Sequence, residues 1–281
     1  FVFKDGQGGD VFVALTMVKK NDETGMPASY ALQFISRGAT SWAAEGDVLY
    51  LGGDAALAEA AEAEYAAFSS KLLGGAQKPL LGVRLPALRR LAAQLVRENG
   101  EAALSLCTRG QYFEDVMLKG MVLGRLPAPL NTVLAETRAF LGEIDNWSVC
   151  DSFCAGYLHA KRHPGEIFAF AKAYLSDRRE FAARFGIVLL MDHFRGTPYA
   201  AQALGAIAEV DAAGRYYVQM GLAWALATFY LEFPDEVFHI LATHTDSAVR
   251  RMAVRKLCES RRVPALAKAQ AKQIVKERKV T

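Results

Sequence analysis

The stretch AALAEAAEAEYAAF, residues 55–68, marks the point where the chain changes from strand-like to helical patterning. Alanine and glutamate are strong helix formers, and the stretch contains no proline or glycine that would interrupt a helix. From here the helical period continues almost without strand signals to Val275. The sequence therefore predicts a mainly α-helical protein, with a helical domain over residues 55–281.

Prolines recur where helices are expected to begin, because proline in the first turn loses no hydrogen bond and already has a helical φ. Pro86 is the first of them, and the others are spaced 34, 36 and 30 residues apart, at Pro164, Pro198, Pro234 and Pro264. This interval fits two helices plus turns, the unit of a HEAT-like array. Ordinary bundles also start helices with proline, but the regular spacing favours an α-solenoid of antiparallel helix pairs whose inner row forms a concave face.

Residues 1–54 have a different pattern. Residues 10–19 are β-branched and apolar, residues 30–37 alternate in part, and residues 47–51 form a short run that ends at Gly52 and Gly53. We expect a short strand-rich N-terminal segment of unknown role. Three strands alone are marginally stable, so this segment should lean on another part of the molecule.

Composition narrows the class of protein. A chain of 281 residues with 52% hydrophobic and 22% charged residues can bury a core, and its apolar runs fall short of the roughly 20 residues of a membrane span. Four cysteines form no disulfide framework, which favours a cytoplasmic location and buried thiols. His159 and His163 stand one helical turn apart without an evident third ligand, so neither a metal nor another cofactor is expected.

Basic residues gather at the C-terminal end, although the net charge is only +3. From Arg250 onward only Glu259 and Glu277 oppose them. The stretch is either an ordinary solvated helix face or a surface for a polyanion such as duplex DNA, with Arg250, Arg251 and Arg255 as the first candidates. The basic residues are Arg250, Arg251, Arg255, Lys256, Arg261, Arg262, Lys268, Lys272, Lys276, Arg278 and Lys279.

The motif IDNWSVCD, residues 144–151, is the first candidate for chemistry. Asp145 or Asn146 can cap a helix that begins near Trp147, and the spacing then puts Trp147 and Asp151 on one face, one turn apart. The alternative is a core tryptophan with an aspartate that forms a hydrogen bond between helices.

Two further segments hold candidate residues. In RYYVQM, residues 215–220, and onward to Trp224, the side chains of Tyr217, Met220 and Trp224 form one helical stripe, which is usually a core stripe. In FAARF, residues 181–185, Arg184 is a lone guanidinium in an apolar helix. It is either paired with a buried acid or directed at a phosphate.

In order, spacing and residue type these segments resemble the AlkD-like family of alkylpurine DNA glycosylases. The resemblance runs from about residue 70 to residue 262 and includes LLGVRLP, residues 80–86, and the YYVQM segment that precedes a tryptophan. It implies that Trp147 and Asp151 are catalytic, that Arg184 is an active-site arginine, and that Trp224 lines the cleft. The chain departs from the family pattern at Leu73, in place of an aromatic residue, and at Asp192, in place of a basic one.

The resemblance implies excision of purines alkylated at N3 or N7 from duplex DNA without a cofactor. Such a base already carries positive charge, so aromatic faces can hold it while an ionised Asp151 stabilises the charge that moves onto the sugar. Arg184 would hold a backbone phosphate, and Tyr216 and Tyr217 would help to bind substrate. The other two hypotheses are a non-catalytic nucleic-acid-binding protein of the same fold and a protein-interaction scaffold.

Overall fold

The computed structural model describes residues 2–4, 10–20, 27–36, 57, 60–73, 78–107, 112–212 and 214–277. In the first part of the chain, β1 (Val2–Lys4), β2 (Asp10–Lys20) and β3 (Pro27–Ser36) pair antiparallel in the order β1-β2-β3. β2 and β3 occupy two of the three stretches for which strands are predicted. The third prediction, residues 47–51, lies outside the described residues.

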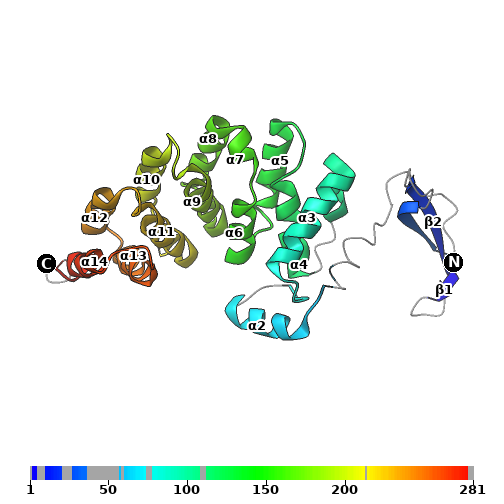
Figure 1. Ribbon diagram of the computed structural model, residues 1–281, viewed down its shortest axis with the longest axis horizontal. Coiled ribbons are helices and arrows are strands. Elements are labelled where there is room, and N and C mark those ends of the chain that lie inside the picture. Colours follow the sequence, from blue (N-terminus) through cyan, green and yellow to red (C-terminus); the bar gives the residue numbers. More distant parts are fainter. Residues whose placement is uncertain are drawn as a thin grey trace.

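From Ala63 onward the described chain is helical, which confirms the predicted mainly helical class (Figure 1). None of its helices has the length and apolar character needed to cross a membrane. The helices are α2 (Ala63–Leu73), α3 (Leu85–Asn99), the 3-10 helix η1 (Gly100–Cys107), α4 (Phe113–Leu123), α5 (Leu130–Phe140), α6 (Trp147–Ala155), α7 (His159–Arg162), α8 (Pro164–Tyr174), α9 (Glu180–Phe194), α10 (Ala200–Ala208), α11 (Tyr216–Phe229), α12 (Pro234–Thr243), α13 (Ser247–Glu259) and α14 (Ala265–Glu277).

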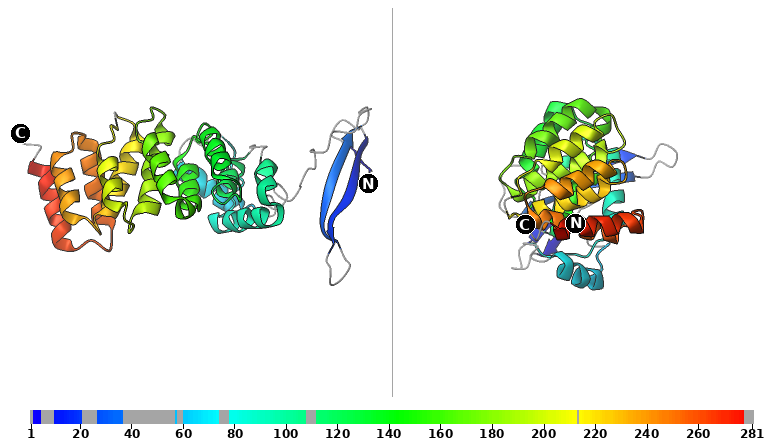
Figure 2. Two further views of the ribbon diagram at one scale, coloured as in Figure 1. Left: turned by 90° about the horizontal axis from the view of Figure 1, so that it is seen from above. Right: turned by 90° about the vertical axis from the view of Figure 1, so that its left-hand side faces the viewer.

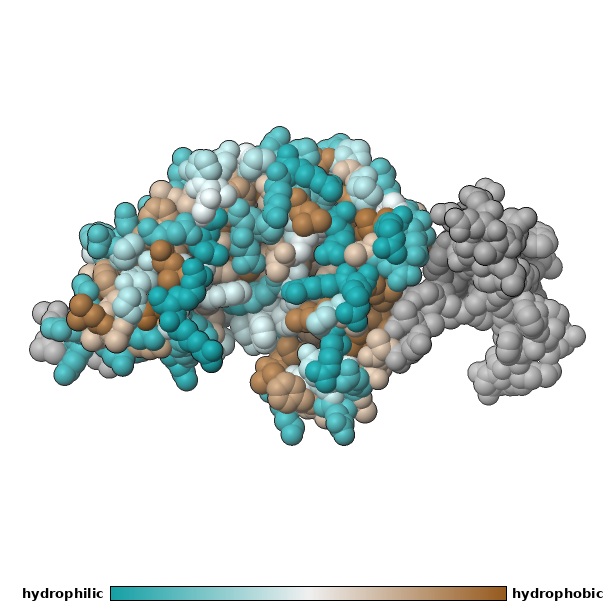
Figure 3. All heavy atoms as spheres, viewed as in Figure 1, coloured by the Kyte–Doolittle hydropathy of each residue, from teal (hydrophilic) through white to brown (hydrophobic). Residues whose placement is uncertain are grey.

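The helices stack in two rows along an elongated array (Figures 1 and 2). In the inner row each helix contacts the next, in the order α4, α6, α9, α11 and α13. The outer row contains α5, α8, α10 and α12, and α14 closes the end against α12 and α13. In Figure 3 the lower side of the molecule is hollowed between α2 and the C-terminal helices.

The proline spacing marks one helix of each pair. Pro164 and Pro234 are the first residues of α8 and α12, while Pro198 and Pro264 lie just before α10 and α14. Pro86 lies in the first turn of α3. The regular interval therefore corresponds to successive helices outside the inner row.

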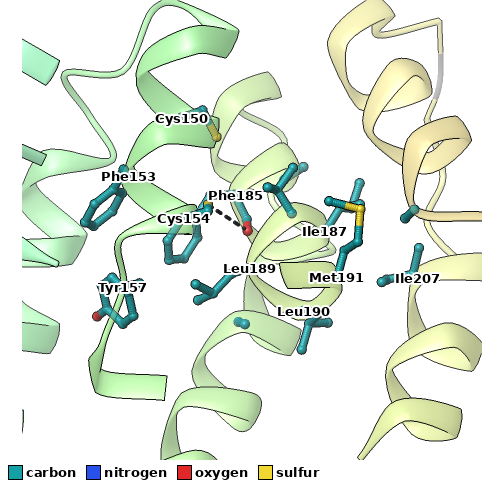
Figure 4. Packing of buried hydrophobic residues seen from close by; sticks show 14 of the residues in the cluster. Cys150, Phe153, Cys154, Tyr157, Phe185, Ile187, Leu189, Leu190, Met191 and Ile207 are labelled. Atoms are coloured by element: carbon teal, nitrogen blue, oxygen red, sulfur yellow. Dashed lines mark hydrogen bonds between the residues drawn. The ribbon is translucent and has the colours of Figure 1, made fainter. Parts of the chain in front are cut away.

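The core lies between the rows, and residues of α9 such as Phe185, Leu189 and Leu190 contribute to it (Figure 4). Every residue of α9 from Ala182 to Met191 is buried, because the helix is apolar on all sides and packs against α6, α8, α10 and α11. The Phe185 ring stacks on that of Phe153 in α6, with 5.6 Å between the ring centroids. This packing fixes α9 relative to α6, so polar side chains on these two helices have defined positions.

All four cysteines are free thiols, of which Cys107, Cys150 and Cys154 are buried and Cys258 is half-buried. The Cys150 and Cys154 thiols face α9, where they donate to the backbone carbonyls of Phe181 and Phe185, at 3.6 and 3.7 Å. Burial is the main reason why the pKa of the Cys154 thiol is raised well above its usual value. These cysteines therefore serve as small core residues.

Candidate active site on the inner row

Asp151 lies on α6, whose first turn is fixed by the residue before it. The Asn146 Oδ1 atom accepts a hydrogen bond from the Ser148 backbone N–H at 2.8 Å and caps the helix, as one of the two predicted caps should. Trp147 is the first residue of α6, and Asp151 follows one turn later. The Asp151 side chain is 16% exposed, so the carboxylate is sheltered but reaches solvent.

Arg184 holds Asp151 from the neighbouring helix α9. Its Nε and Nη2 atoms donate to the two carboxylate oxygens of Asp151, both at 2.8 Å, and its Nη1 atom donates to the backbone carbonyl of Tyr217 in α11 at 2.6 Å. The pKa of Arg184 is raised, because the hydrogen bonds and charge of Asp151 outweigh desolvation, the largest single effect, which lowers it. One guanidinium thus joins three successive inner helices.

The sequence leaves open whether Arg184 pairs with a buried acid or is directed at a phosphate. In the structure it pairs with an acid, the sheltered Asp151. The residue is only 5% exposed, and its donors are directed at Asp151 and Tyr217. Because so little of the residue is exposed, the guanidinium offers no open face to a DNA phosphate. The prediction that Arg184 holds a phosphate is therefore corrected: the residue orients Asp151.

Asp151 opens into a pocket of about 480 Å³ on the inner row, here called the inner pocket. Trp147 from α6 and Trp224 from α11 line it together with Asp151, and both tryptophans are only partly buried. Of the four residues that the resemblance assigns to the active site, three therefore line this pocket, and the fourth, Arg184, lies behind Asp151. A larger cavity of about 670 Å³ beside the α8–α9 turn has no aromatic lining residue, and its Asp177 is paired with Arg179.

Helix α2 forms one wall of the inner pocket, and the predicted LLGVRLP motif explains how it is held. The buried Glu114 carboxylate accepts hydrogen bonds from the backbone N–H groups of Leu81, Gly82 and Val83, at 2.7 to 3.2 Å. Gly82 has φ +83°, and a Cβ atom there would collide with the backbone carbonyl of Glu62 just before α2. The motif therefore packs closely against the start of α2 and holds the helix in place.

Sequence reasoning missed the apolar side chains that α2 adds to the inner pocket, Tyr65, Phe68 and Leu72. Their spacing along one helical stripe is the available signal, but such a stripe is normally read as core. Here Phe68 is 58% exposed. Leu73, where the family pattern has an aromatic residue, is buried, and its carbonyl accepts a hydrogen bond from the Asn146 side chain at 3.1 Å.

Asp192 also lines the inner pocket, two helical turns after Arg184 on α9. Its side chain is exposed on the pocket side, yet the protein around it desolvates the carboxyl group. This desolvation, followed by the negative charge of Asp151, raises the pKa of Asp192 to about 6. In the inner pocket Asp151 and Asp192 therefore lie in unlike environments, one paired with Arg184 and one open to water.

The two tyrosines predicted to bind substrate have different positions. Tyr216 is 54% exposed at the start of α11, whereas Tyr217 is half-buried against the ring of Phe181, with 5.2 Å between centroids. Neither belongs to the lining of the inner pocket. In the predicted stripe, Trp224 therefore faces the pocket, while Tyr217 serves the structure through its carbonyl bond with Arg184.

The predicted basic surface on α13 needs one correction. Arg250 is only 8% exposed, because it lies on the face of α13 that is buried with Val249 and Ala253, and it cannot contribute to an open basic surface. Arg251 and Arg255 are exposed, one turn apart on the same face. Arg255 pairs with Glu259 at 3.4 Å at the surface, an interaction too weak to prevent contact with DNA.

His159 lies in the core. It is buried, and its Nε2 atom lies 3.2 Å from the backbone carbonyl of Leu123. Burial lowers its pKa. Over the described ranges no group of three or more side chains of His, Cys, Asp or Glu is arranged to hold a metal ion.

Comparison with known proteins places this site in a family. A family model described as "DNA alkylation repair enzyme" matches residues 54–259, which is more than half of the chain and includes every residue of the inner pocket. Neither the curated proteins nor the solved structures gave a match.

Proposed function

The chain belongs to the DNA alkylation repair enzyme family, and on that premise we propose that it is a monofunctional DNA glycosylase with a HEAT-like array. Its substrates are purines that carry positive charge after alkylation at N3 or N7, in duplex DNA. One observation carries the proposal: a carboxylate held by a buried guanidinium opens into a pocket between two tryptophans.

The inner pocket suits a flat cation. The faces of Trp147 and Trp224 attract positive charge, and this attraction strengthens where water is excluded. An alkylated purine cation leaves the sugar as a neutral base, so the reaction needs no general acid. The protein has to bind the cation and then stabilise the positive charge as it moves onto the sugar.

Asp151 is placed for the second task. A preorganised negative charge stabilises a cationic transition state without reorganising at the moment of reaction. Arg184 is a positioning residue, because its two hydrogen bonds fix the plane of the Asp151 carboxylate and its third bond anchors the pair to α11. The Arg184 guanidinium approaches from the protein interior, which leaves the pocket side of Asp151 for substrate.

The exposed basic residues of the C-terminal helices supply the contact with the DNA backbone. Besides Arg251 and Arg255 on α13, the exposed basic residues after this pair are Arg261, Arg262, Lys272 and Lys276. Such contacts position the duplex and do not read its sequence. Because the inner pocket lies on the open inner side of the array, the damaged base need not enter a closed cavity.

The direct test is release of N7-methylguanine from duplex DNA under single-turnover conditions. Wild-type protein should release the base faster than an enzyme-free control. Asp151→Asn should lower the rate by about 10²–10³, the scale for one preorganised electrostatic contact, while DNA binding survives. Asp235→Asn, an exposed carboxylate on α12, is the matched control and should leave the rate unchanged. Equal rates for Asp151→Asn and wild type would contradict the role given to Asp151.

A non-catalytic DNA-binding protein is the second candidate, and one observation favours it. Both oxygens of Asp151 are occupied by Arg184, so this carboxylate is poorly placed to take a proton from water. That function predicts salt-sensitive binding of duplex DNA without release of any base. The same assay distinguishes the two candidates.

A further inference from the structure

Hydrolysis of the bond between sugar and base releases a proton from the attacking water, and the inner pocket contains three acids that could take it, Glu114, Asp151 and Asp192. Two of them are occupied. The Glu114 oxygens accept three backbone N–H groups, and the Asp151 oxygens accept two donors of Arg184. Proton transfer to either would disrupt the bonds that hold α2 or orient Asp151.

Asp192 is the remaining acid. Within the described part of the chain no hydrogen bond or ion pair engages its carboxylate, and its side chain is exposed on the pocket side. It stands on α9, whose residues from Ala182 to Met191 are all buried, so its backbone is fixed relative to Asp151. Water and the sugar of a bound nucleotide can therefore both reach it.

We propose that Asp192 is the general base of this site, which takes a proton from the water that attacks C1′ of the damaged nucleotide. The inference rests on the proposed glycosylase function. The water oxygen forms the new bond to C1′ as the C1′–N bond breaks. The bonding electron pair neutralises the purine cation, and the proton moves to Asp192 and then to solvent.

The charged neighbours of Asp192 support this assignment. Desolvation and then the charge of Asp151, on α6, raise its pKa, and Arg195, after α9, lowers it. The Nη1 atom of Arg195 itself lies 3.4 Å from the Oε1 atom of Glu232, beyond α11. His193 is bonded to the Cys154 carbonyl on α6. A pKa of about 6 leaves Asp192 ionised at neutral pH and basic enough to accept a proton, the condition that favours general-base catalysis.

The two carboxylates then have separate tasks. Asp151, fixed by Arg184, provides a constant negative charge, and Asp192 exchanges the proton. Environments that differ in this way are how neighbouring acids acquire different catalytic roles.

The test is the pH dependence of N7-methylguanine release, measured under single turnover from about pH 5 to about pH 8 with the enzyme-free rate subtracted. Wild type should show a rate that rises with pH through about 6 and then levels. Asp192→Asn should lose this rise and fall by about 10² at the plateau, whereas Asp192→Glu should restore part of the rate together with the rise. Asp235→Asn again serves as the control.

Several results would overturn the inference. If Asp192→Asn excises at the wild-type rate with an unchanged pH profile, or excises faster, Asp192 is not the base, while the glycosylase function stands. If Asp192→Glu shows no rise with pH, the carboxylate does not carry the proton. If wild type releases no base at all, the proposed glycosylase function fails together with this inference. Wild type alone gives that result, so it is distinguishable from a failure of the Asp192 assignment.

Discussion

Replacement of Asp151 by asparagine should destabilise the protein more than replacement of its partner Arg184 by methionine. Asparagine keeps one oxygen but turns an amide N–H₂ group toward the guanidinium donors, and Arg184, at 5% exposure, then stays buried without its counter-charge. Breaking a buried pair in this way costs about 3–5 kcal/mol, and because the Asp151 side chain is 16% exposed we expect the lower end, about 3 kcal/mol.

Methionine at position 184 has a different effect. It removes the buried charge and leaves Asp151 able to bind water through the pocket, so the cost is mainly that of the missing hydrogen bonds, about 2 kcal/mol. Because Asp151→Asn does its damage through Arg184, the double variant should cost about 2 kcal/mol and not the sum of about 5 kcal/mol. The coupling energy between the two sites is then about 3 kcal/mol.

Urea unfolding followed by circular dichroism measures all four corners of this cycle. Since 1 kcal/mol corresponds to roughly 2–4 °C in Tm for a chain of this size class, Asp151→Asn should also unfold roughly 6–12 °C below wild type. Two outcomes would refute the reasoning: an Asp151→Asn variant with the wild-type urea midpoint, or additive effects of the two substitutions.

Three other predictions follow from the same structure. Charge reversal at Arg251 and Arg255 should weaken duplex DNA binding for every sequence. The slope of the log binding constant against the log salt concentration should become shallower by about 0.9 for each phosphate that the protein no longer neutralises. Reversal at Lys172, exposed on α8, should change neither quantity, and fluorescence anisotropy at a series of salt concentrations measures both. Gly82→Ala should cost about 1–3 kcal/mol and make α2 more sensitive to limited proteolysis, because the residue has φ +83° and its Cβ has no room; wild-type sensitivity would show that α2 is not seated there. Desolvation lowers the pKa of His193 below its unfolded value. The stability that the neutral ring provides is therefore present above about pH 6.5 and is lost as the pH falls through the folded pKa. Thermal unfolding from about pH 7 to about pH 5 should show this loss of stability, and His193→Asn should reduce the loss.

The helical class and the repeat interval can be predicted from the sequence because both depend on local patterns. Proline at the first turn of a helix and an apolar period of about 3.6 are properties of a few neighbouring residues. The placement of Trp147 and Asp151 on one face is equally local, since it follows from their spacing and from the Asn146 cap.

The partner of Arg184 could not be decided in this way. The choice between an acid and a phosphate depends on which residue 33 positions away reaches the guanidinium, and this is set by the packing of α6 against α9. Arg250 misled for a related reason: its charge is visible in the sequence, but its burial follows from the contact between α13 and α11. The wall formed by α2 could not be foreseen either, because a half-exposed apolar stripe and a core stripe have the same spacing.

The guanidinium that joins α6, α9 and α11 also makes the inner pocket responsive to mechanical bending of the array. An array of stacked helix pairs changes curvature by small rotations between neighbours. Arg184 is tied to α6 through Asp151 and to α11 through the Tyr217 carbonyl, so such a rotation must either strain these bonds or carry the carboxylate along with it. A rotation between α9 and α11 would therefore also change how Asp151 is presented in the inner pocket.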